Sequence, residues 1–133
     1  MENLYIEPTE ITPRVDFDSK SKKFELSGVS RPEDVVAFYE SIIFKIEKYI
    51  NQLLKNENTL ANIKFQLVFD LNYINSASSK YILQILGLFK KIYLKGATVN
   101  CTWYYEDLDD QILEDGEDLS DVIKMDFEFL ERQ

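Results

Sequence analysis

The feature that most constrains the fold of this chain is an apolar strand that runs almost directly into an amphipathic helix. Over residues 63–71, apolar side chains alternate with mostly polar ones, and this period of two is typical of a β-strand. From Ser76 or Ser78 to Leu94, apolar residues recur at three- and four-residue spacing, as on one face of an α-helix. The strand is rich enough in apolar residues to predict a central place in its sheet.

The rest of the chain adds elements of the same two kinds. Alternating stretches within residues 1–30 predict short strands, two of which are joined by a polar turn at 19–22. The further elements that we expect are a helix over 32–55, a strand over 97–105, a short helix at 108–113 with a loop near Gly116, and a closing strand over 123–129. This order predicts an α/β fold, with a mixed sheet flanked by helices in a single domain that spans residues 1–133.

The predicted helix over 32–55 has an unusually wide apolar stripe. Val36, Ile43 and Phe44 extend the stripe beyond the face that a sheet alone would bury. We interpret this width as a helix that packs between the sheet and a neighbouring helix. A groove that receives a partner protein is the alternative.

Composition excludes several classes of partner and site. The chain has 24 Asp plus Glu against 15 Lys plus Arg, and its formal net charge of −9 disfavours binding to nucleic acids and anionic membranes. Histidine is absent, which removes the commonest general base near neutral pH and the commonest zinc ligand. Cys101 is the only cysteine and lies in an apolar run, so we expect it to be buried. We expect neither a metal nor a cofactor.

The sequence also bears on where the chain acts. Its first residues lack the basic and apolar regions of a signal peptide. No apolar run approaches the roughly 20 residues that a membrane-spanning helix needs. We therefore expect a cytoplasmic protein with no membrane partner.

Polar chemistry is most concentrated in residues 75–80, between the central strand and the helix that follows it. Asn75 or Ser76 can cap the helix, which stabilises it by about 1 kcal/mol. The same place suits phosphorylation, because a phosphate on Ser76 would meet free backbone amides and the positive end of the helix dipole. It would add about −1.5 to −2 charges and disrupt an interface built over the bare hydroxyl. The sequence thus predicts a switch at Ser76, surrounded by Asn75, Ser78, Ser79 and Lys80.

Two other functions fit parts of the sequence. A Ser76/Lys80 pair could provide the nucleophile and base of a hydrolase, although its spacing is one residue longer than that of the Ser-x-x-Lys motif. Residues 106–121 carry nine acidic groups and no basic one, in a pattern that does not fit a calcium-binding loop. They could form a constitutive acidic adaptor for a basic partner. We expect an interaction module rather than an enzyme, with both functions as alternatives.

Four stretches together resemble the SiaC family of small bacterial regulatory phosphoproteins, which are similar to STAS-domain anti-sigma-factor antagonists. These stretches are residues 4–18, 28–33, 73–80, and 103–106 with the acidic segment behind them. The resemblance covers nearly the whole chain and implies a STAS-like fold. It also implies that Ser76, the hydroxyl residue directly after an asparagine, is the phosphoacceptor.

The resemblance further implies a partner-switching function in cyclic di-GMP signalling. A serine/threonine kinase with a histidine-kinase-like ATPase fold would phosphorylate Ser76, and a metal-dependent PPM-type phosphatase would remove the phosphate. The unmodified form would bind and activate an output protein such as a diguanylate cyclase, and phosphorylation would block this. Ala77 departs from many relatives, which carry another hydroxyl there, and it leaves Ser76 as the acceptor. A STAS-type anti-sigma-factor antagonist is the alternative within this kind of switch.

Overall fold

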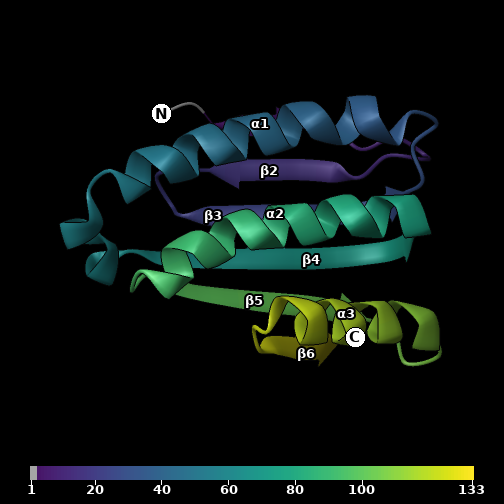
Figure 1. The fold of residues 1–133 in the computed structure, drawn as a ribbon. Coiled ribbons are helices and arrows are strands. Elements are labelled where there is room, and N and C mark those ends of the chain that lie inside the picture. The colour runs from purple at the N-terminus through teal and green to yellow at the C-terminus, as the bar shows by residue number, and fades with distance from the viewer. Residues whose placement is uncertain (1–2) are drawn as a thin grey trace.

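The chain folds into one six-stranded sheet whose helices all cover the same face. A computed structural model describes residues 3–133 and places the strands in the order β1-β2-β3-β4-β5-β6. The strands are β1 (Leu4–Ile6), β2 (Arg14–Asp18), β3 (Lys23–Ser30), β4 (Lys64–Ile74), β5 (Thr98–Tyr105) and β6 (Phe127–Glu131). The helices are α1 (Val35–Leu54), α2 (Ser76–Leu94) and α3 (Asp110–Ile123), with a short 3₁₀ helix, η1 (Glu57–Asn62). Figure 1 shows α1, α2 and α3 side by side in front of the sheet.

The pairing of the strands confirms the predicted mixed sheet. The pairs β1–β2 and β2–β3 are antiparallel, whereas β3–β4, β4–β5 and β5–β6 are parallel. Each parallel pair is connected through one α-helix, with η1 following α1 in the first connection, so the chain from β3 onward is a series of β-α-β units. The strand predicted over 63–71 lies at the centre of the sheet as β4, as its apolar content indicated.

Large aromatic side chains fill the space between the sheet and the helices. Phe24 of β3 packs against Phe69 of β4 and Phe89 of α2, with ring centroids 6.1 and 5.9 Å away. Trp103 of β5 packs against Phe69 at 5.4 Å, and all four side chains are fully buried. This core holds α2 firmly against β4 and therefore fixes the junction between them.

The long first helix begins later than the sequence indicated. It starts at Val35, and the carboxylate of Asp34 accepts a hydrogen bond from the backbone N–H of Ala37 at 3.0 Å. The expectation that the helix includes residues 32–34 is wrong, because Asp34 acts as the N-cap and is not part of the first turn. The alternating predicted strands over 14–18 and 23–27 are confirmed as β2 and β3.

The predicted boundaries fail most clearly near the C-terminus. Helix α3 continues through Gly116, where we expected a loop, because this glycine lies against the indole of Trp103. A Cβ at position 116 would be only 2.5 Å from Trp103 Nε1. Strand β6 begins at Phe127, so Ile123 ends α3 and does not open the strand. Ile123 and Met125 still pack on the core, which explains the misleading alternation.

The outward faces of the helices also differ in part from expectation. Helix α1 does contact both α2 and, through Tyr39 and Tyr49, the sheet, yet Val36 and Phe44 remain 44% and 66% exposed. The interpretation that internal packing accounts for the whole wide stripe is therefore wrong for these two residues. Tyr93 of α2 is 45% exposed, and Gly96, which follows the helix, has a positive φ of 112° that favours glycine. Among the helices of residues 3–133, none combines the length and apolar content needed to cross a bilayer.

Candidate functional site

Strand β4 passes into α2 through a single capping residue. Asn75 has an extended backbone, and its side-chain oxygen accepts a hydrogen bond from the N–H of Ser78 at 2.8 Å. Asn75 is therefore the N-cap, and Ser76 is the first residue of the helix. Ser76 is exposed, and its hydroxyl forms no hydrogen bond with any residue in the range 3–133. The hydroxyl is thus presented to solvent at a fixed helix N-terminus.

Ser78 has a different environment, although it lies only two residues further on. Its side chain is fully buried and accepts a hydrogen bond from Ser30 Oγ at 2.8 Å. It also donates to the backbone oxygen of Ser30 at 3.2 Å. The hydroxyl of Tyr39 lies 2.6 Å from Ser30 Oγ, and burial raises the pKa of Tyr39 to about 12. These three hydroxyls join β3, α1 and α2 in the core, so Ser78 supports the site from behind.

Ser79 and Lys80 complete the predicted cluster. Ser79 is half-buried, and its hydroxyl donates to the backbone oxygen of Asn75 at 3.4 Å. Lys80 is exposed, and within residues 3–133 no hydrogen bond joins it to Ser76. The structure therefore contains no preformed Ser76/Lys80 pair of the kind that a hydrolase would use.

A shallow hollow of about 390 Å³ opens beside Ser76. It is lined by Tyr73, Ile74, Asn75, Ser76, Ser79, Gln111 and Asp115. Three of the predicted residues, Asn75, Ser76 and Ser79, thus share one surface, whereas Ser78 and Lys80 are not part of its lining. Within residues 3–133 no group of three or more Cys, Asp or Glu side chains is arranged to hold a metal ion.

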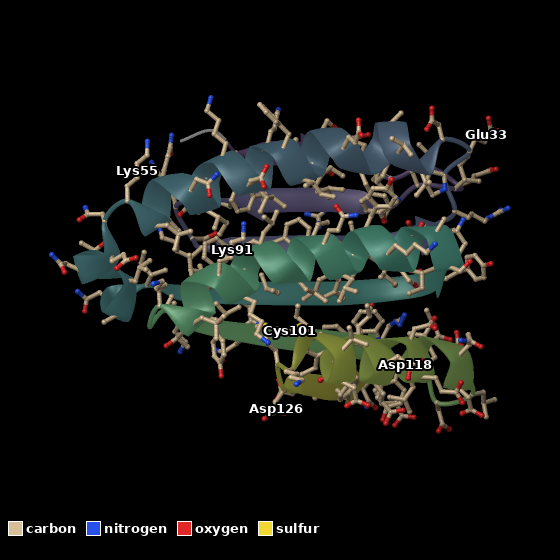
Figure 2. The ribbon with its side chains drawn as sticks, viewed as in Figure 1. Glu33, Lys55, Lys91, Cys101, Asp118 and Asp126 are labelled. Carbon is tan, nitrogen blue, oxygen red and sulfur yellow. The ribbon has the colours of Figure 1, made fainter. Side chains whose placement is uncertain are left out.

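The far wall of this hollow belongs to α3, which the sequence did not connect with Ser76. Gln111 Nε2 donates to Asp115 Oδ1 at 2.9 Å. Partial burial raises the pKa of Asp115 above its ordinary value, the hydrogen bond from Gln111 opposes this, and three neighbouring carboxylates add to it. Figure 2 shows oxygen-tipped side chains gathered along α3 around Asp118. A phosphate on Ser76 would therefore enter a negatively charged surrounding.

The position of Asp115 could have been found only with the correct helix boundaries. Gln111 and Asp115 are four residues apart, which places them on one face of a continuous helix. The expected loop near Gly116 would have ended that helix and separated the acidic segment from the switch residue. No other signal in the sequence joins the two stretches.

Comparison with known proteins identifies the family. The model of the SiaC family of regulatory phosphoproteins matches residues 6–132. The chain belongs to the SiaC family. Over 116 residues it is 26% identical to an uncharacterised protein of Pseudomonas aeruginosa strain UCBPP-PA14, covering 86% of this chain and 84% of that protein. The regulatory role and the family expected from the sequence are thus confirmed.

Solved structures of SiaC from Pseudomonas aeruginosa have the same fold. The crystal structure of the apo form matches with a TM-score of 0.79 at 22% identity, over the full length of both chains. A second crystal structure is described as the diguanylate cyclase SiaD in complex with its activator SiaC. It matches with a TM-score of 0.81, also at 22% identity. This second match covers 97% of this chain and 99% of that one. The predicted α/β fold with a mixed sheet and flanking helices is confirmed.

Proposed function

We propose that this SiaC-family protein activates a diguanylate cyclase and that phosphorylation of Ser76 prevents activation. The observation that carries the proposal is the contrast between three nearby serines. Ser76 is exposed with an unengaged hydroxyl, whereas Ser78 is buried and Ser79 is half-buried and bonded to the backbone. Of these three hydroxyls, that of Ser76 is therefore the most accessible to a kinase. SiaC of Pseudomonas aeruginosa, which has this fold, is described as the activator of the cyclase SiaD.

The physical basis of the switch is a charge placed at the start of a helix. The N–H of Ser78 already bonds to Asn75, but the amides before it remain available to phosphate oxygens. The fold therefore tolerates the modification. A partner that covers bare Ser76 would instead have to bury a dianion close to Asp115, and burial of a charge without a partner is strongly unfavourable.

The proposal includes two modifying enzymes. A serine/threonine kinase with a histidine-kinase-like ATPase fold adds the phosphate, and a PPM-type phosphatase removes it. The chain itself binds and activates its target and has no catalytic role of its own. It acts in the cytoplasm, where ATP and the substrate of a cyclase are available.

Phosphorylation is tested with the kinase encoded in the same genome. The chain is incubated with this kinase and ATP, and the modified peptide is located by mass spectrometry. We expect one phosphate, on Ser76, and none on the Ser76→Ala variant. A phosphate found on Ser79 or elsewhere in the wild-type chain would contradict the assignment.

Binding is tested with the diguanylate cyclase of the same organism by isothermal titration calorimetry. The Ser76→Asp variant should bind at least about tenfold more weakly than the wild type, which corresponds to about 1.4 kcal/mol. Ser21→Asp is the matched control, because Ser21 is exposed in the turn between β2 and β3, at the opposite end of the sheet. Equal affinities for wild type and Ser76→Asp would refute the switch.

A further inference from the structure

The outer surface of α1 and α2 contains a groove that the Ser76 site does not use. It has a volume of about 780 Å³, and its lining includes Ile43 and Phe44 of α1 and Tyr81 and Gln84 of α2. Figure 1 shows the two helices running alongside each other in the same direction, and the lining of the groove extends from Ala37 to Glu47, about three turns of α1. An elongated surface between two helices suits a third helix.

Exposed apolar side chains mark this surface as unpartnered. Phe44 is 66% exposed, Ile43 is half-buried, and Val36 lies two turns before them and is 44% exposed. Residues seven and eight positions apart lie on the same side of an α-helix, so the three form an apolar stripe along α1 that is interrupted by Glu40, four residues from both Val36 and Phe44. Exposed apolar side chains gathered on one side of a helix are typical of an interaction site.

Charge around the stripe indicates what kind of helix would cover it. Glu40 and Glu47 line the groove, are exposed, and form no ion pair with any residue in the range 3–133. Lys45 is the single cation in the lining. A helix that places Lys or Arg beside both glutamates would gain attraction and specificity. A second copy of this chain would instead bring these carboxylates together between two molecules of net charge −9.

The groove is connected to the switch site through α2. The ring of Tyr81 stacks on that of Tyr39, with centroids 5.5 Å apart and an interplanar angle of 9°. Tyr39 in turn belongs to the buried hydroxyl cluster with Ser30 and Ser78. Ser76 precedes Tyr81 by five residues, which is about 7.5 Å along the helix axis. Five residues also turn the helix by about 140°, so Tyr81 faces α1 whereas Ser76 lines the hollow shared with α3.

We propose that the groove between α1 and α2 binds an amphipathic helix of the output protein. The apolar stripe of that helix packs on Phe44, Ile43 and Tyr81, and its basic residues pair with Glu40 and Glu47. An output protein that binds in the groove and also covers the start of α2 would meet a phosphate on Ser76. The identification of the bound protein as the output partner rests on the proposed function. The binding of a basic amphipathic helix in the groove does not depend on that function.

The groove is tested first with a peptide of defined chemistry. A helical peptide of about 18 residues, with a leucine stripe flanked by lysines, is titrated into the ¹⁵N-labelled chain, followed by a counterpart with glutamates for lysines. We expect amide shifts confined to α1, α2 and the residues around them. The glutamate peptide should bind at least about tenfold more weakly. Shifts centred on α3, or equal binding of both peptides, would overturn the proposal.

Matched variants separate the groove from the acidic helix. Phe44→Ser should weaken binding of the lysine peptide about tenfold, because apolar side chains at the centre of an interface dominate its affinity. Leu108→Ser is the control, because it also replaces an exposed apolar residue with serine, at a position next to α3 that is 95% exposed, and it should have no effect. Likewise, the double variant Glu40→Gln and Glu47→Gln should bind the lysine peptide more weakly, whereas Asp118→Asn should bind it as the wild type does. A loss of binding with the control variants instead would overturn the assignment.

The cyclase then tests the link to function. Phe44→Ser should lose cyclase binding while the kinase still phosphorylates Ser76. If the wild-type chain binds no cyclase, the proposed function fails, but the peptide titration still decides the groove. If the cyclase binds Phe44→Ser as tightly as the wild type, the groove is not the output surface. A dimer in analytical ultracentrifugation that Phe44→Ser dissociates would make a second copy the occupant and overturn the proposal.

Discussion

Ser30 Oγ and Ser78 Oγ lie 2.8 Å apart in the core, and both side chains are completely buried. The pair connects the end of β3 to the first turn of α2. The N–H of Asn75 also donates to the backbone oxygen of Ser30 at 3.0 Å, so the same strand end fixes the helix cap. The start of α2 is therefore held by buried hydrogen bonds on one side and presents Ser76 to solvent on the other.

This relationship predicts that two serines in the same turn contribute very differently to stability. Ser78→Ala removes a buried hydrogen-bond partner and should lower the free energy of unfolding by about 1–3 kcal/mol. Ser76→Ala changes an exposed hydroxyl and should stay within about 0.5 kcal/mol of the wild type. Urea unfolding followed by tryptophan fluorescence measures both. Equal destabilisation by the two variants would contradict the structural division between them.

The close approach of Gly116 to Trp103 gives a second prediction. Gly116→Ala places a methyl group 2.5–2.6 Å from three indole atoms, and Trp103 cannot retreat because it is fully buried and its Nε1 donates to Ile112. The overlap should cost about 1–3 kcal/mol of stability, more than the gain in helix propensity. Urea unfolding measures the change in stability.

Gly87 provides the matched control for this substitution. It lies within α2, and a Cβ there would meet no atom within 4 Å. Gly87→Ala should therefore stabilise the chain by about 0.5–1 kcal/mol, because alanine favours the helix. A Gly116→Ala variant as stable as Gly87→Ala would show that the indole has room to move.

The sequence predicts β4 and α2 well because each has a clear period and one buried face. It fails at Gly116, where a glycine usually marks a helix end but here makes room for a tryptophan from another element. The same error hides Asp115, which lines the hollow beside Ser76 only because α3 is continuous. Periodicity identified the wide stripe on α1 but could not show that Phe44 would stay exposed. Local sequence patterns thus predict the individual helices and strands, whereas contacts between these elements determine which residues lie together at the site.

Burial of the single cysteine predicts low thiol reactivity. Cys101 is 3% exposed, and burial strongly raises the pKa of its thiol. In the folded chain at pH 8 it should react with Ellman's reagent at least about a hundredfold more slowly than a free thiol, because only rare opening exposes it. Adding urea beyond the unfolding midpoint should restore the full rate. Rapid reaction in the native chain would mean that β5 and α3 separate readily.

The raised pKa of Asp115 predicts how its charge affects stability with pH. Because the folded chain holds this proton more tightly than the unfolded chain, whose carboxyl has the ordinary pKa of 3.8, ionisation of Asp115 disfavours folding. The protonated side chain of Asp115 contributes fully to the stability of the fold at pH values below the pKa of the unfolded chain. This contribution is lost as the pH rises through the higher pKa of the folded chain. Asp115→Asn should therefore raise the midpoint of urea unfolding at pH 7. The difference in midpoint between this variant and the wild type should shrink towards pH 4.

Phosphorylation should enlarge this effect, because a phosphate on Ser76 would share the hollow with Asp115. The gain from Asp115→Asn at pH 7 should be greater in the phosphorylated chain than in the unmodified one. Asp126→Asn is the control, since it removes one exposed charge from the same acidic chain at a position outside α3. An equal gain in both phosphorylation states would mean that a phosphate on Ser76 points away from α3 and leaves Asp115 undisturbed.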